Sequence, residues 1–121
     1  MCLIVIAYRV LPGTPLLLAG NRDEFYERPA QPVHKWNTSP EIIAGKDLKE
    51  GGTWLGIAKN GRFATLTNYR DIDNIRENAP SRGKIITNLL KSTMEPSRFM
   101  TSLINDAEKY NGFNLLSFDG L

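Results

Sequence analysis

Two aliphatic runs near the start of the chain place the tightest limit on its fold. CLIVIAY (2–8) and PLLLAG (15–20) contain almost no polar residue, and Pro12-Gly13 lies between them. Strands without polar alternation are usually covered on both faces, as they are in layered structures of sheets and helices. Because a Pro-Gly pair is typical of a turn, the two runs are expected to be antiparallel neighbours. We therefore predict an α/β fold in which these strands are buried.

Three later segments also have the composition of strands. EIIAG (41–45) predicts a short strand, and FNLLSF (113–118) predicts a final one. GTWLGIAKNGRFATLTNY (52–69) predicts a hairpin, because Asn60-Gly61 accepts the positive φ of a tight turn.

Two further segments space their apolar residues at intervals of three and four, which predicts helices. The first covers 81–92 with Ser81 as its cap, and the second covers 95–110 with Pro96 in its first turn. The stretch 27–40 contains three prolines and predicts a long surface excursion.

A dense group of polar residues, Asn21-Arg22-Asp23-Glu24, follows the second aliphatic run directly. Antiparallel pairing would bring the end of this run near the start of the first, so we expect the four side chains beside Cys2. They have two interpretations. They surround a reactive terminus, or they form a structural network in which Arg22 bridges carboxylates and fixes the loop that follows.

Cys2 itself has a chemical and a structural interpretation. Initiator methionine is normally removed before a small residue, and removal would leave a chain that begins at Cys2. Its α-amine, which titrates near ~7.7–8.0, would then lie beside its thiol, so that base and nucleophile share one residue. In the structural interpretation, Cys2 is a small hydrophobic residue that begins a buried strand.

Composition excludes several classes of function. The 121 residues carry a net charge of +2 with Lys and Arg spread along the chain, which gives no footprint for nucleic acid or an anionic membrane. The longest apolar run near the start is too short for a membrane span. A single cysteine excludes an internal disulfide and fits a reducing compartment, so we predict a cytoplasmic protein. Its oligomeric state stays open.

The last residues bear on whether the domain is complete. Asp119-Gly120 after a strand usually opens a hairpin, and no second strand follows it. We therefore expect residues 1–121 to form a single incomplete domain whose C-terminal part is missing.

Four motifs together resemble one family. MCLIVIAY, LLLAGNRDEFYERP, EGGTWLGIAKNGRFATLTNYR and YNGFNLL are similar, in this order, to the NRDE family, also called the transport and Golgi organisation family. The resemblance implies an α+β fold like that of the N-terminal nucleophile hydrolases, an αββα sandwich of which this chain holds the N-terminal half. Within that superfamily the layout is similar to the cysteine acylases that act on penicillin V and bile-acid amides.

The resemblance also implies roles for individual residues. Cys2 stands in the place of the acylase nucleophile, and Arg22 with Asp23 stands at the strand end beside it. Asp23 would accept a hydrogen bond from the terminal amine, while Arg22 would stabilise a thiolate. Asn68 stands where the acylases carry the amide that donates to the oxyanion. Asn21 and Glu24 would support these groups.

The implied function is cleavage of an amide or a thioester bond in a small molecule. The competing class is a binding or trafficking protein that does no chemistry, with haem or acyl-coenzyme A as its ligand and links to Golgi organisation and secretion in eukaryotic members. In that class His34, the single histidine, is a candidate axial ligand. No Cys or His spacing predicts a metal site.

Two more residues are candidates for ligand contact. Gly52 belongs to a glycine pair that suits a tight turn and also lets a ligand approach the backbone. Trp54, like Trp36, is interpreted as a packing residue that has the alternative of lining a pocket.

Overall fold

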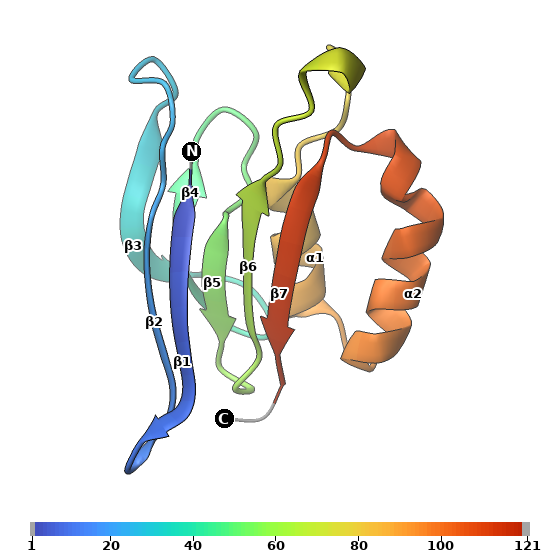
Figure 1. Ribbon diagram of the computed structural model, residues 1–121. Coiled ribbons are helices and arrows are strands. Elements are labelled where there is room, and N and C mark those ends of the chain that lie inside the picture. Colours follow the sequence, from blue (N-terminus) through green and yellow to red (C-terminus); the bar gives the residue numbers. More distant parts are fainter. Residues whose placement is uncertain (1, 120–121) are drawn as a thin grey trace.

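The computed structural model describes residues 2–119 and has a mixed α+β architecture (Figure 1). Its strands are β1 (Leu3–Leu11), β2 (Thr14–Asn21), β3 (Ala30–Trp36), β4 (Ile42–Asp47), β5 (Leu55–Ala58), β6 (Phe63–Asn68) and β7 (Phe113–Phe118). Its helices are α1 (Gly83–Lys91) and α2 (Pro96–Asp106), with short 3-10 turns η1 (Ile72–Asn74) and η2 (Ala107–Lys109).

The strands form two separate antiparallel sheets. One is the β1–β2 hairpin, and the other has five strands in the order β3-β4-β5-β6-β7. The two predicted hairpin turns are confirmed, and each contains a glycine with positive φ, +73° at Gly13 and +86° at Gly61. The predicted final strand is also confirmed, since β7 pairs with β6 along its whole length.

The core lies between the five-stranded sheet and α1. Ala44, Gly56 and Ala64 are neighbours in register across three strands, and this row of small residues forms a shallow seat for the helix. A Cβ at Gly56 would lie 2.8 Å from Leu90 Cδ1, which shows how closely the helix approaches. The absence of bulk on the sheet therefore lets the apolar face of α1, including Ile86 and Leu90, become fully buried.

The β1–β2 hairpin packs on the opposite face of this sheet. Side chains alternate between faces along a strand, so Phe63 points away from the face that Ala64 gives to α1. Phe118 pairs with Phe63, and its ring meets the Tyr8 ring of β1 with centroids 5.5 Å apart. Figure 1 shows the result, with the hairpin in front of the sheet and α1 behind it.

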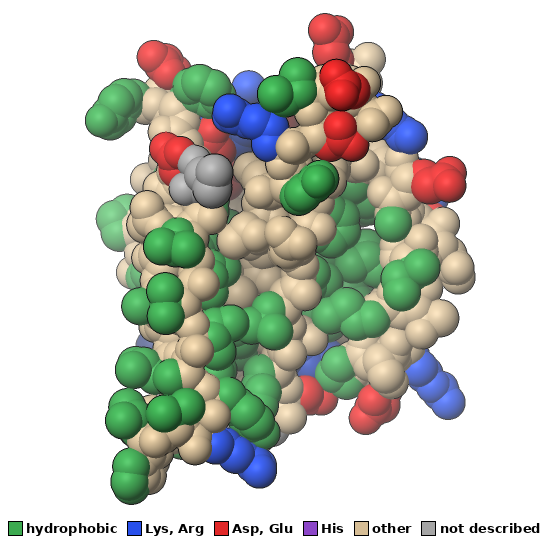
Figure 2. Space-filling view, viewed as in Figure 1, with side chains coloured by type: hydrophobic (Ala, Val, Ile, Leu, Met, Phe, Trp, Pro, Cys, Tyr) green, Lys and Arg blue, Asp and Glu red, His purple; other side chains and the backbone are tan. Residues whose placement is uncertain are grey.

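The prediction that the two aliphatic strands are buried is wrong. Side chains on the outer face of the hairpin are largely exposed, among them Leu3 (62%), Val5 (59%) and Leu17 (50%). Figure 2 shows hydrophobic side chains (green) at the surface along the side of the molecule where the hairpin lies in Figure 1. Within residues 2–119 only the inner face of the hairpin has a sheet to cover it, and the sequence pattern did not reveal this.

The predicted surface excursion at 27–40 is also wrong, because it contains β3. This strand lies at the edge of the sheet, where a proline is tolerated since one side of the strand needs no hydrogen-bond donor. Pro32 falls at the register shift between Gln31 and His34, where the ladder with β4 is interrupted. The local composition therefore did not predict β3, because this strand is defined by its pairing with β4.

The two predicted helices are present, but the predicted cap of the first helix, Ser81, is wrong. Pro96 begins α2 as predicted. The position before α1 is Arg82 rather than Ser81, and no side chain caps the helix there. Ser81 instead accepts through its carbonyl from the Lys84 N–H.

Arg62 joins the end of α1 to Asp119, the residue that follows β7. Its side chain is buried, and its Nη1 donates to the carbonyls of Leu89 (3.2 Å) and Ser92 (2.6 Å). Its Nε and Nη2 donate to the two carboxylate oxygens of Asp119, each at 3.3 Å. The carbonyls at a helix C-terminus have no partner within the helix, so this guanidinium satisfies groups that would otherwise be buried without one.

Candidate functional site

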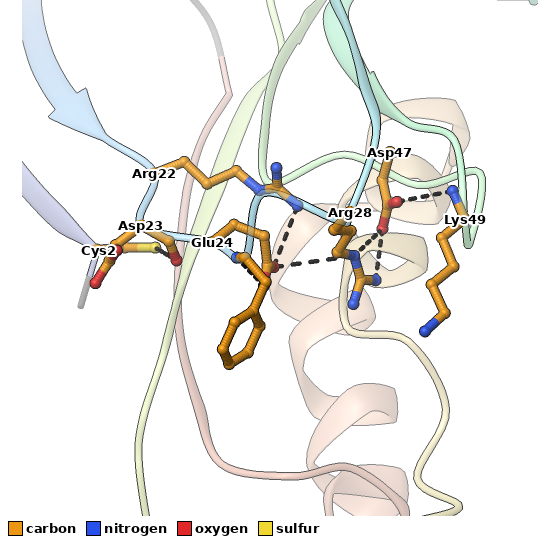
Figure 3. Close-up of polar contacts among 8 residues, drawn as sticks. Cys2, Arg22, Asp23, Glu24, Arg28, Asp47 and Lys49 are labelled. Atoms are coloured by element: carbon orange, nitrogen blue, oxygen red, sulfur yellow. Dashed lines mark hydrogen bonds and ion pairs between the residues drawn. The ribbon is translucent and has the colours of Figure 1, made fainter.

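Pairing of β1 with β2 brings the start of the chain to the polar group that follows β2. Leu3 is in register with Asn21, and its N–H donates to Asn21 Oδ1 at 3.3 Å. Cys2 Sγ lies 4.0 Å from the carbonyl oxygen of Asp23 (Figure 3). The expected proximity of this group to Cys2 is therefore confirmed.

A cavity of ≈ 370 Å³ opens beside Cys2. Its wall is shared between the hairpin, the five-stranded sheet and the segment that leads into α1. Cys2, Arg22, Trp54, Asn68 and Arg82 are among the residues that line it. The volume falls in the range of small-molecule sites.

Arg22 does not point at Cys2. Its Nη2 donates to Glu24 Oε2 at 3.2 Å, and in Figure 3 the side chain extends away from Cys2 toward Glu24. The Glu24 carboxylate also accepts from the Phe25 N–H and lies 3.9 Å from Arg28. This geometry matches the structural interpretation, in which Arg22 helps to fix the loop.

The network continues from Arg28 to Asp47 at the end of β4. Arg28 Nη2 and Nε donate to Asp47 Oδ2 at 2.6 and 3.0 Å, and Asp47 Oδ1 accepts from the Lys49 N–H. Burial by itself would raise the pKa of Asp47, but the hydrogen bonds from Arg28 and Lys49 and the Arg28 charge together hold it below its ordinary value. The hydrogen bond to Asp47 raises the pKa of Arg28. This pair therefore ties the loop after β2 to the five-stranded sheet.

Asn68 ends β6 with its side chain at the cavity. Its amide makes no side-chain hydrogen bond with any residue in 2–119, and Cys2 lines the same cavity. Chain positions far apart in the sequence thus place a thiol and an unengaged amide at one cavity.

The other candidates have different surroundings. Trp54 lines the cavity, whereas Trp36 is buried in the core. Gly52 is not part of the cavity wall; it is buried against Gly83, and a Cβ there would lie 2.5 Å from the Gly83 carbonyl carbon. His34 lies on β3 outside the cavity wall, with Nδ1 2.8 Å from the Pro32 carbonyl.

Met1 lies outside the described residues. The expected contact between a terminal amine and Asp23 therefore stays a prediction.

Sequence reasoning missed Arg82. This residue directly precedes α1, and its Nη1 donates to the Gly112 carbonyl at 2.7 Å. Burial lowers the pKa of Arg82, the Arg28 charge lowers it further, and Glu24 and Cys2 act in the opposite direction. The available signal was an arginine in the position before a helix where a capping acid or hydroxyl is common.

Comparison with known proteins gives the family. A family model described as Transport and Golgi organisation 2 matches residues 1–120. The chain belongs to this family.

Members of the transport and Golgi organisation 2 family from animals are similar to the chain over nearly its whole length. The Transport and Golgi organization protein 2 homolog of Bos taurus is 39% identical over 126 residues, covering 98% of this chain and 45% of the relative. The Homo sapiens homolog is 37% identical over 126 residues, with the same coverage. The Transport and Golgi organization protein 2 of Drosophila melanogaster is 32% identical over 131 residues, covering 98% of this chain and 46% of the relative.

The chain thus spans less than half the length of these curated relatives. Among residues 2–119, no helix has the length and apolar character needed to cross a membrane.

Proposed function

We propose that Cys2 is the nucleophile of a hydrolase-like site that cleaves an amide or a thioester, on a fold of the N-terminal nucleophile hydrolase type. The observation that carries the proposal is the shared cavity of Cys2 and Asn68. Acyl transfer requires a nucleophile and a hydrogen-bond donor aimed at the oxygen on which charge develops. A thiol and an amide that has no side-chain hydrogen bond within residues 2–119 are suitable groups for these two tasks.

The reaction begins with removal of Met1, which frees the α-amine of Cys2. This amine takes the thiol proton, and the thiolate attacks the carbonyl carbon of the substrate to form a tetrahedral intermediate. Asn68 donates a hydrogen bond to the oxyanion, and removing such a donor typically costs ~2.7–4 kcal/mol in the barrier. The amine or thiol leaves with the proton from the ammonium, and a thioester forms on Cys2.

Water completes the cycle. The α-amine accepts a proton from the attacking water, the Cys2–acyl bond breaks, and the thiol regains its proton. One water is consumed, and the products are a carboxylic acid and the amine or thiol of the substrate. Asp23 orients the α-amine in this proposal, and the Arg22–Glu24–Arg28 network holds the loop that carries Asp23.

The second candidate is a binding or trafficking protein for haem or acyl-coenzyme A that does no chemistry. Two observations favour it. Arg22 is engaged by Glu24 rather than directed at the thiol, and the relatives are named for transport and Golgi organisation. In this candidate the same cavity binds its ligand without reacting with it.

Acyl trapping distinguishes the two candidates. Purified protein, with loss of Met1 verified by mass spectrometry, is mixed with a small acyl thioester and examined for an added acyl mass on Cys2. We expect an adduct that forms in the parent, is absent in Cys2→Ala and forms about 100-fold more slowly in Asn68→Ala. Absence of any adduct in parent protein with a free Cys2 amine would support the binding protein instead.

A further inference from the structure

The cavity beside Cys2 has charged walls whose charges do not cancel. Among residues 2–119, five cationic and four anionic side chains line it, and these are Arg22, Arg28, Lys46, Lys49 and Arg82 with Glu24, Asp47, Glu50 and Glu77. One positive charge is therefore left over among these side chains, which matches a ligand with a single negative charge.

Most of the cations on this wall already have partners. Arg22 pairs with Glu24, Arg28 pairs with Asp47, and the Lys46 ammonium lies over the Trp36 ring at 5.2 Å. Arg82 differs from the other arginines on this wall. It forms no ion pair with any residue in 2–119, although it is only partly exposed.

The environment of Arg82 favours an added anion. A guanidinium has five N–H donors, and the structure uses one of them, toward Gly112. Burial and the charge of Arg28 lower the pKa of Arg82, while Glu24 and Cys2 act in the opposite direction, and a further anion beside the guanidinium would favour its charged form. The first turn of α1 also contains no acidic residue, and its backbone N–H groups add positive potential on the same side.

We infer that Arg82 binds the carboxylate of a monoanionic acyl compound whose carbonyl group lies next to Cys2. This inference rests on the proposed function and names its substrate class. The planar fork of a guanidinium matches a carboxylate, which accepts two parallel N–H bonds. A second negative charge on the ligand would meet Glu50 and Glu77, which line the same cavity. The selected substrate is thus an amide or thioester of a dicarboxylic acid, or an N-acyl amino acid.

Binding can be measured in a variant that lacks the Cys2 thiol and therefore cannot react with the ligand. The background is Cys2→Ala, and the probes are N-phenylsuccinamic acid and its methyl ester, which differ by one negative charge and one methyl group. Calorimetric titration of both probes gives the ratio of their dissociation constants. We expect the acid to bind about 10-fold or more tightly than the ester, the range typical of a hydrogen-bonded charge pair.

Three substitutions in that background assign the preference. Arg82→Gln should bring the ratio close to one, and Arg82→Lys, which keeps the charge and loses the fork, should leave part of it. Arg98→Gln is the matched control, because Arg98 is an exposed arginine on α2 outside the cavity wall. Thermal melts of each variant show whether loss of the Gly112 contact has damaged the fold.

Each outcome decides a separate point. Equal affinity of the two probes in the Cys2→Ala protein overturns the inference, even if no Arg82 variant folds. An unchanged ratio in Arg82→Gln overturns the role of Arg82. A preference for the acid without any acyl adduct in the parent leaves this inference standing and rejects the hydrolase. An acyl adduct without a preference for the acid supports the hydrolase and rejects this inference.

Discussion

Gly52 and Gly83 meet backbone to backbone. A Cβ at Gly52 would lie 2.5, 2.8 and 2.9 Å from the carbonyl carbon, the carbonyl oxygen and the Cα of Gly83. The Thr53 N–H donates to the Gly83 carbonyl at 3.3 Å in the same contact. This contact presses the start of α1, and with it Arg82, against the segment that leads into β5.

We expect Gly52→Ala to lower the free energy of unfolding by about 1–3 kcal/mol, because backbone atoms cannot move aside as a side chain can. Urea denaturation measures the loss. Gly45→Ala is the control, since its nearest new contact is the Gln31 carbonyl oxygen at 3.2 Å and the expected loss is smaller. Equal stability of Gly52→Ala and the parent would show that the two segments can separate freely.

Arg62→Met should destabilise the protein by about 3 kcal/mol. The substitution leaves two carbonyls at the end of α1 and the Asp119 carboxylate without their donor. Thermal and urea unfolding report the change. The exposed pair of Lys35 with Glu41 provides the comparison, and Lys35→Met is expected to change the free energy of unfolding by less than about 1 kcal/mol. Similar losses in both variants would mean that burial of Arg62 adds nothing.

Asp47 should make stability depend on pH in the acid range. Its pKa is held below the ordinary value in the folded protein, so the carboxylate stabilises the fold above its unfolded pKa of ~3.9. This contribution is lost as the pH falls through the lower, folded pKa. Asp47→Asn should therefore be about 1–3 kcal/mol less stable than the parent at pH 7, with the difference shrinking below about pH 4.

Urea titrations between pH 7 and pH 3 follow this difference. Asp73→Asn is a suitable control, because Asp73 is an exposed carboxylate on η1. A gap between Asp47→Asn and the parent that stays constant down to pH 3 would contradict the assignment to ionisation of Asp47.

Asn68→Ala should separate a catalytic amide from a structural one. The Asn68 side chain is exposed at the cavity without a hydrogen bond to residues 2–119, so the expected change in the free energy of unfolding is within about 0.5 kcal/mol. Asn114→Ala on the neighbouring strand removes an amide that donates to Thr67 Oγ1 and provides the comparison. A loss above about 1 kcal/mol for Asn68→Ala would assign that residue to the framework.

Local signals predicted the elements that are determined locally. Pro12-Gly13 and Asn60-Gly61 define their turns by backbone preference, and the three-and-four spacing identified both helices. β3 was missed because its strand character comes from pairing with β4 and from its edge position, and its own prolines argue against it.

The site was predictable in part for the same reason. Antiparallel pairing alone brings Asn21 and Asp23 to Cys2, and the sequence contains that information. The partner of Arg22 depends on side-chain geometry in a loop. The position of Arg82 depends on where α1 packs, which the Gly52–Gly83 contact determines and no local pattern shows.

Within the described residues 2–119 the two sheets share no backbone ladder, yet the cavity wall belongs to both of them. A ligand that contacts Cys2 on the hairpin side and Asn68 on the other side would add a connection to those that the Arg28–Asp47 pair and the Tyr8–Phe118 contact already make between the two sheets. A ligand that binds only when the hairpin and the five-stranded sheet are both in place opposes their separation. By mass action, at 100 times its dissociation constant it adds about 2.7 kcal/mol to the free energy of that separation. Amide hydrogen exchange of β1 and β2 should then slow on ligand binding, which makes the hairpin a reporter of occupancy whether or not a bond is cleaved.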